Sequence, residues 1–246
     1  MTSEYKYNPW PLGKLPIDFQ RPEPNLIRQF GYQWEDPRDI IDIFEDKIAR
    51  FTGSKYCVLT DSCTSGIFLS LKYRDYKNEI SIPVHTYVSV AMQILESGAI
   101  LEFRDEKWSG IYELNGVNIF DSAARFGPDI YVGSGALQVL SFQIKKRLPI
   151  GKGGAILTDS YHAYEWLKLS SYDGRDLKIP YDDPKHVKSL GWHFYMTPED
   201  AARGIILMDK LGSDWSDYLD WNHYPPLTSY DFFNSNLQVL QKNKEK

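Results

Sequence analysis

The sequence predicts an α/β fold in which a mostly parallel sheet is flanked by helices. Two patterns carry this prediction. Short apolar runs, typical of buried strands, alternate along the chain with segments whose apolar residues recur at helical spacing. Such alternation is characteristic of β-α-β units, whose helices cover both faces of a parallel sheet. A length of 246 residues is enough for one sizeable core.

The first predicted helix follows Asp36-Pro37, because aspartate is a favoured N-cap and proline suits the first helical position. Its apolar residues keep helical spacing as far as Phe51, and Gly53 ends it. The same spacing predicts further helices at 65–73, 88–98, 161–169 and 198–211. Short apolar runs predict strands at 56–60, 79–83, 99–105, 117–121, 137–142 and 154–159.

These elements define a domain that spans residues 36–211. Residues 1–35 are rich in proline, aromatic and polar residues. We expect them to form an extended arm that packs on another surface, because aromatic side chains such as Trp34 would be costly to leave in water. The periodic patterns fade after residue 211, and residues 212–246 are expected to form a tail that packs on the domain or on a dimer partner.

Composition and charge exclude several functional classes. The formal net charge of −5 offers no basic excess for binding nucleic acid or an anionic membrane surface. No apolar run is long enough to predict a membrane span or a signal peptide. Cys57 and Cys63 are too few for a secreted disulfide scaffold, and the histidines lack metal-ligand spacing. We therefore expect a cytoplasmic protein with no metal, no nucleic-acid partner and no membrane partner.

Polar side chains follow the predicted strands, at the edge where sheets of this kind bind ligands. Residues 61–64 form a hydroxyl-rich turn that enters a helix, and they could be a simple N-cap or a phosphate site. Residues 85–87, Asp121 and residues 143–147 follow other strands. Singly, these groups have ordinary explanations as packing, turn or solvated loop residues. Together they would suit a planar, phosphorylated, cationic heterocycle.

Five sequence blocks are informative because of their order and spacing along the chain. They are FTGSKYCVLTDSCTSGIFLSL, IPVHTYVSVAMQILESGAILEFRD, IFDSAARFG, LSFQIKKRLPIGKGGAILTD and LGWHFYMTPEDAARGIILMDKL. In this order they resemble the DegT/DnrJ/StrS family of pyridoxal-phosphate-dependent sugar aminotransferases, within the aspartate-aminotransferase superfamily of fold type I. The resemblance runs from about residue 36 to 211. It implies the large domain of that fold with a reduced C-terminal domain, pyridoxal 5'-phosphate as cofactor, and a homodimer with shared active sites.

The resemblance implies a role for each polar group. Lys146 corresponds to the lysine that forms a Schiff base with the cofactor: three residues separate it from Ser141-Phe142 and six from Gly153-Gly154, whereas Lys145 misses this spacing by one. Asp121 corresponds to the carboxylate that keeps the pyridine nitrogen protonated. The other implied cofactor-binding residues are Cys63, Thr64 and Ser141 at the phosphate, Tyr87 on the ring face, and His193 at the phosphate held by the partner subunit.

The chain also departs from the family pattern. Cys63 replaces a glycine, Lys152 a glutamate, His193 an asparagine and Tyr195 an arginine. Ala124 replaces a glutamine that would bond the cofactor's phenolic oxygen, a bond that Arg125 is a candidate to replace.

The expected reaction moves an amino group from an amino acid such as glutamate to a keto sugar carried on a nucleotide, as in polysaccharide biosynthesis. Two alternatives stay open. One is a non-catalytic relative that binds the cofactor or a partner, which the loss of the glutamine and of the C-terminal domain favours. The other is sugar dehydration, which in this family replaces the lysine by histidine. Lys146 argues against the second.

Overall fold

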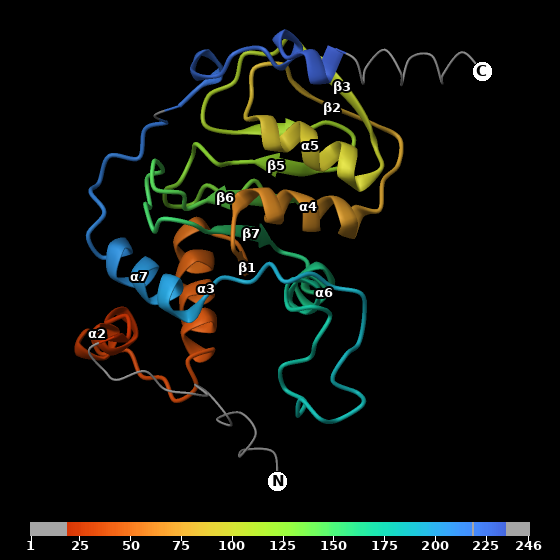
Figure 1. The fold of residues 1–246 in the computed structure, drawn as a ribbon. Helices are drawn as coiled ribbons and strands as arrows, with labels where there is room; N and C mark the ends of the chain where they lie inside the picture. The colour runs from red at the N-terminus through yellow and green to blue at the C-terminus, as the bar shows by residue number, and fades with distance from the viewer. Residues whose placement is uncertain (1–18, 218, 235–246) are drawn as a thin grey trace.

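The computed structural model describes residues 19–217 and 219–234 (Figure 1). Its helices are α2 (Glu23–Gln29), α3 (Asp39–Thr52), α4 (Cys63–Arg74), α5 (Val88–Ser97), α6 (Tyr161–Ser171) and α7 (Pro198–Met208), with short 3-10 helices at Trp221–His223 and Leu227–Ser229. Its strands are β1 (Tyr56–Thr60), β2 (Glu79–Pro83), β3 (Ile100–Arg104), β4 (Tyr112–Leu114), β5 (Ile119–Asp121), β6 (Leu137–Ser141) and β7 (Gly154–Thr158).

The main sheet has the order β1-β7-β6-β5-β4, and β2 pairs with β3 in a second, parallel sheet. Strands β5 and β6 are parallel, whereas β7 runs against both of its neighbours and β4 runs against β5. An antiparallel bridge between Ser81 and Asn115 gives β2 the direction of β1, β5 and β6. The predicted α/β class is therefore confirmed, but the sheet is mixed, because β4 and β7 oppose the other described strands.

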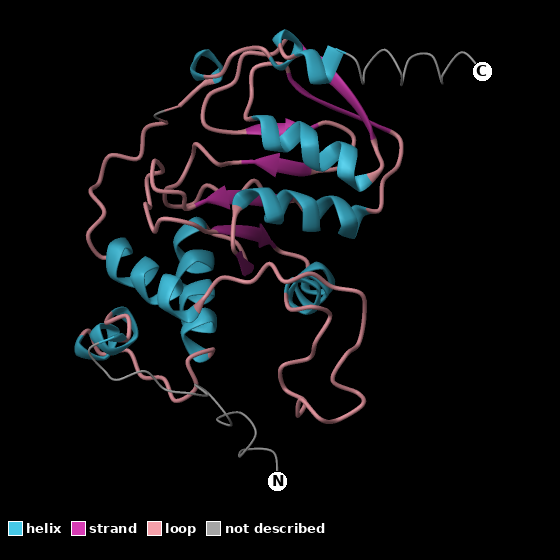
Figure 2. Cartoon of the chain, in the orientation of Figure 1, coloured by secondary structure: helices cyan, strands magenta, loops and turns pink. Residues whose placement is uncertain are grey.

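Helices cover both faces of this sheet (Figure 2). In β1, Val58 belongs to the core under α4 and α5, while its neighbours Cys57 and Leu59 belong to the core under α3 and α7. This alternation is the two-residue period of a strand, whose successive side chains point to opposite faces. Both cores are apolar, so the sheet is buried on each side and its strand ends are held rigidly.

The predicted helix start at Asp36-Pro37 is early, because α3 begins at Asp39. The Asp36 carboxylate instead closes a turn by accepting a hydrogen bond from the amide of Arg38 at 2.8 Å. Gly53 ends the helix in the left-handed region at φ 80°, as predicted. The remaining predicted helices and strands lie within a few residues of the observed ones.

The predicted extended arm is wrong in its described part, because Glu23–Gln29 forms the helix α2. One apolar side chain explains the difference: Ile27 is fully buried, and α2 packs on α7. The Trp34 indole donates to the Pro24 carbonyl at 2.9 Å, and the Arg28 guanidinium lies 4.0 Å from the centre of the Trp34 ring. The first eighteen residues of the predicted arm lie outside the described part.

The described chain after α7 returns across the ends of the strands. Its Leu227 amide donates to the Val84 carbonyl at 2.8 Å, and Leu227 and Phe233 are buried in the core with β2 and β3. Residues 235–246 of the predicted tail lie outside the described part. Among the described residues, no helix has the length and apolar character needed to cross a membrane.

Candidate active site

The start of α4 faces the carboxyl ends of the central strands. Ser62 caps the helix by accepting a hydrogen bond from the Ser65 amide at 3.1 Å. The Thr64 hydroxyl donates to Ser89 in the first turn of α5 at 2.9 Å, which ties the two helix starts together. The amides of Cys63 and Thr64 have no partner among the described residues. They remain available as donors for an anion.

Gly154 brings this helix start against the sheet. A side-chain Cβ at Gly154 would lie 2.5 Å from the Cys63 amide nitrogen, so only glycine permits the approach. Gly154 also pairs directly with Ser141 at the end of β6. The Ser141 hydroxyl forms no hydrogen bond with a described residue, so the predicted phosphate-binding residues come together with free donors.

Asp121 ends β5 and is buried. Its Oδ2 accepts a hydrogen bond from the Tyr112 hydroxyl at 2.7 Å, and its Oδ1 accepts one from the Ala123 amide at 2.8 Å. Burial raises the pKa of Asp121, whereas these two hydrogen bonds and the positive charge of Lys146 act in the opposite direction. Asp121 is thus a buried carboxylate held in one orientation.

Lys146 lies in the turn after β6, half-buried, and its amide donates to the Gln143 carbonyl at 2.8 Å. Its charge lowers the pKa of both Asp121 and Cys63, although burial raises each of them overall. The Lys146 ammonium forms no ion pair with a described residue. Lys145 is exposed. Lys146 is therefore the lysine whose charge acts on two other predicted site residues, Asp121 and Cys63, and its catalytic role stays a prediction.

Tyr87 and His193 lie at the margins of this cluster. Tyr87 precedes α5 and is 58% exposed. His193 pairs through Nδ1 with Asp173 Oδ2 at 2.9 Å. The next residue along, Phe194, accepts a hydrogen bond from the Asp61 amide at 2.7 Å, so His193 lies beside the turn that enters α4 of its own chain. A contact of His193 with the partner's phosphate stays a prediction.

Two of the residues that differ from the family pattern or were expected to compensate for it, Lys152 and Arg125, bond to carboxylates of this chain. Lys152 forms an ion pair with Asp61 at 3.1 Å. Ala124 is buried. Arg125, the candidate to replace the missing glutamine, instead holds Asp217 of the returning chain through two hydrogen bonds at 2.9 and 2.6 Å. It anchors this segment beside the site rather than offering a free donor.

Sequence reasoning missed Tyr112, which contacts Asp121 directly. No signal in the sequence could have found it, because Tyr112 lies in a strand of three residues that is too short to show a period.

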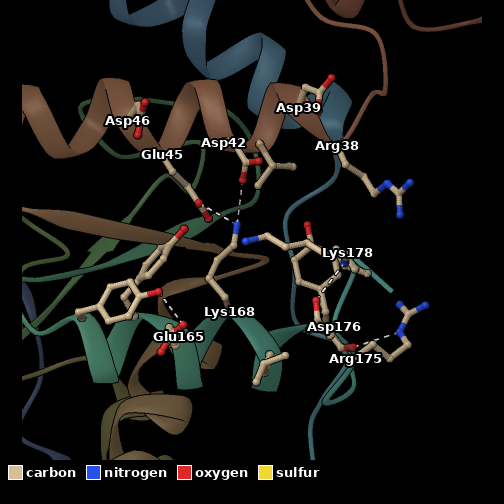
Figure 3. A pocket seen from close by; sticks show the side chains of 16 residues that line it. Arg38, Asp39, Asp42, Glu45, Asp46, Glu165, Lys168, Arg175, Asp176 and Lys178 are labelled. Atoms are coloured by element: carbon tan, nitrogen blue, oxygen red, sulfur yellow. Dashed lines mark hydrogen bonds and ion pairs between the residues drawn. The ribbon is translucent and has the colours of Figure 1, made fainter. Parts of the chain in front are cut away.

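A cavity of about 740 Å³ lies away from this cluster, between α3, α6 and the chain that follows α6 (Figure 3). None of the predicted site residues lines it. Its inner wall holds Lys168, whose ammonium pairs with Glu45 at 2.8 Å and with Asp42 at 3.2 Å (Figure 3). The Glu45 carboxylate also accepts a hydrogen bond from the Leu59 amide at 2.9 Å. These charges satisfy one another, so we interpret the network as structural.

The fold and the polar residues at the strand ends are similar to those of aminotransferases, as comparisons with known proteins show. The sequence pattern of the DegT/DnrJ/EryC1/StrS aminotransferase family matches residues 31–109, which confirms the resemblance predicted from the sequence. No curated protein sequence matches the chain.

Solved structures, among them aminotransferases, share the fold. AtS13 from Actinomadura melliaura is 19% identical with a TM-score of 0.60, over 76% of this chain and 63% of that one. The sugar aminotransferase CalS13 from Micromonospora echinospora is 14% identical with a TM-score of 0.60, over 76% and 64%. PseC from Helicobacter pylori, an aminotransferase involved in the biosynthesis of pseudoaminic acid, is 20% identical with a TM-score of 0.59, over 78% and 63%. The chain thus spans less than two thirds of each of these relatives.

Proposed function

We propose that this chain is a pyridoxal-phosphate-dependent aminotransferase that moves an amino group from an amino acid such as glutamate to a keto sugar. The observation that carries the proposal is the placement of three groups after strands of the main sheet: Asp121 ends β5 and is buried, Cys63 begins α4 after β1, and Lys146 lies in the turn after β6. The charge of Lys146 acts on the pKa of both other groups. When bound, the cofactor supplies an aldehyde that takes up the amino group and a ring that stores the electrons released at the donor's α-carbon.

The residues present fit this cofactor. The unpartnered amides of Cys63 and Thr64 and the Ser141 hydroxyl would hold the phosphate, aided by the positive end of the α4 dipole. Asp121 would accept a hydrogen bond from the protonated pyridine nitrogen. A buried carboxylate with a raised pKa gains from an adjacent positive charge, because that charge favours its ionised form.

Lys146 acts as the base of the reaction. In its neutral form, the Nζ amine would take the proton from the α-carbon of the donor and deliver it to the aldehyde carbon of the cofactor, and it would move a proton in the reverse direction, to the sugar carbon, when the acceptor is aminated. An amine serves as a base or nucleophile only when it is deprotonated. Lys146 is half-buried, its charge acts on the pKa of Asp121, and it forms no ion pair with a described carboxylate.

The keto-sugar acceptor is supported by relatives of the same fold. CalS13 is named a sugar aminotransferase, and DesI was solved in the presence of its TDP-sugar product, at 18% identity and a TM-score of 0.57. We propose a nucleotide-linked sugar for this chain on that ground. The cytoplasmic location expected from the sequence stays a prediction.

We also propose that the protein is a homodimer whose active sites lie at the subunit interface. Apolar side chains around the cluster are exposed in the single chain, among them Tyr87 and Ile144, with Ile144 at 66%. Such side chains gain by burial against a second copy. Light scattering at micromolar concentration is expected to give the mass of a dimer, and a monomer would overturn this proposal.

Replacing Asp121 by asparagine is expected to keep the fold but to slow the half-reaction with glutamate by about 10²-fold or more, the scale of losing one preorganised electrostatic contact. The neutral amide cannot hold the proton on the pyridine nitrogen. The measurement is the loss of cofactor absorbance after glutamate is added, with circular dichroism to check folding. An unchanged rate would make Asp121 a turn residue only.

The non-catalytic alternative is favoured by Ala124, which stands where the family has a glutamine. The same experiment separates the two functions. A wild-type protein that binds the cofactor but shows no half-reaction with any common amino donor would be a binding protein, and one that does not bind the cofactor would overturn both.

A further inference from the structure

Tyr112 and Asp121 lie directly opposite each other in the antiparallel pair of β4 and β5. Side chains at directly opposite positions share one face of the sheet and lie close enough to interact. The Tyr112 hydroxyl donates to Asp121 Oδ2 at 2.7 Å and also contacts the hydroxyl of Thr86. All three residues are buried, with at most 5% of each exposed.

Elementary chemistry decides which hydroxyl donates in each of these two hydrogen bonds. A phenol has one proton, and an ionised carboxylate can only accept hydrogen bonds. The Tyr112 proton therefore goes to Asp121, and the Thr86 hydroxyl donates to the Tyr112 oxygen. Burial and the charge of Asp121 raise the pKa of Tyr112 well above its usual range, so the phenol keeps its proton. The titratable groups that interact with Asp121 and Tyr112 are Lys146 and Cys63.

The two hydrogen bonds hold the carboxylate from both sides. Tyr112 binds Oδ2, and the Ala123 amide binds Oδ1. A carboxylate has about four acceptor positions, so each oxygen keeps one for a further donor. Tyr112 itself is fixed by packing against Trp108, with ring centres 5.0 Å apart. Thr86, the last residue in this series of hydrogen bonds, immediately precedes Tyr87, the residue predicted to stack on the cofactor ring.

We propose that Tyr112 is a positioning residue: its hydroxyl, itself held by Thr86, orients the Asp121 carboxylate. The ionised carboxylate then faces the position of the cofactor's pyridine nitrogen. This inference rests on the proposed function. The inference also gives a role to the short strand β4, because pairing of β4 with β5 places Tyr112 directly opposite Asp121. It also connects the residue at the ring nitrogen to the loop that carries Tyr87.

The test measures binding of pyridoxamine 5'-phosphate, which needs no covalent bond to a lysine, and of its analogue in which carbon replaces the ring nitrogen. Tyr112→Phe is expected to weaken binding of pyridoxamine phosphate by about tenfold or more, the scale of one hydrogen bond to a charged group. It is expected to leave the affinity for the carbon analogue unchanged. Thr86→Val should act in the same direction with a smaller loss, and it serves as the second variant if Tyr112→Phe does not fold.

Tyr131→Phe is the matched control, because Tyr131 also donates to a carboxylate, Asp159 Oδ1 at 3.2 Å, away from the site. It should change neither affinity. An equal loss for both ligands in Tyr112→Phe, or no loss for either, would overturn the role of Tyr112 while the proposed function stands. Failure of the wild-type protein to bind pyridoxamine phosphate would instead overturn the proposed function, and the inference with it.

Discussion

Replacing Lys146 by alanine is expected to abolish covalent attachment of the cofactor and to slow transamination by about 10²–10⁴-fold, the usual contribution of a positioned acid–base group. Lys146 is half-buried, and its charge acts on Asp121 and Cys63. Lys145, one residue earlier, is exposed, and its amide donates to the Gln143 side chain at 2.7 Å. Consecutive lysines in this turn therefore face different surroundings.

Lys145→Ala is the matched control, because it removes the same charge from the same turn. It is expected to keep the absorbance band of the lysine-bound cofactor, which Lys146→Ala loses. Borohydride reduction followed by peptide mapping locates the attachment directly. A reduced adduct on Lys145 would contradict the predicted spacing, and an adduct on no lysine would favour the non-catalytic alternative.

The helices and most strands could be predicted because their apolar residues repeat over enough positions to show a period. The direction of β7 could not, since the same side chains are buried whichever way a strand runs. Helix α2 was missed because it rests on one buried side chain, Ile27, packed against α7. Strand β4 was missed because it has three residues and exists through its pairing with β5.

The candidate site shows the same division. Residues that follow a strand or begin a helix, such as Asp121 and Thr64, were found because position along the chain fixes their place in the fold. Contacts between distant segments were not. Arg125 was a candidate to replace the missing glutamine, but its partner Asp217 lies 92 residues further along the chain. The Tyr112 contact depends on strand register, which the sequence of so short a strand does not specify.

The largest expected effect on stability concerns Lys168, on the wall of the cavity between α3 and α6 (Figure 3). Replacing Lys168 by methionine is expected to lower the free energy of unfolding by about 1–2 kcal/mol at pH 8, because Glu45 must then take up a proton above its pKa, at about 1.4 kcal/mol per pH unit, or stay charged without its partner. The group left without a partner is the Glu45 carboxylate, which is buried and lies 2.8 Å from the Lys168 ammonium.

The loss should depend on pH in a definite direction. Burial raises the pKa of Glu45 to about 7 even with Lys168 present, and removing that positive charge raises it further. A carboxyl whose pKa is higher in the folded than in the unfolded state stabilises the fold below the unfolded value, near 4.5, and loses that contribution as the pH rises through the folded value. The methionine variant should therefore lose little at about pH 5 and most at pH 8.

Urea unfolding at the two pH values measures this difference. The control is Lys47→Met, because Lys47 pairs with Asp209 at 2.8 Å but that carboxylate is 46% exposed, so a loss of about 1 kcal/mol or less is expected. Adding Glu45→Gln to Lys168→Met should recover most of the stability at pH 8, since no buried charge is then left. An equal loss at both pH values would mean that Lys168 acts through the packing of its hydrocarbon chain, because that packing is the same at both pH values whereas the charge of Glu45 is not.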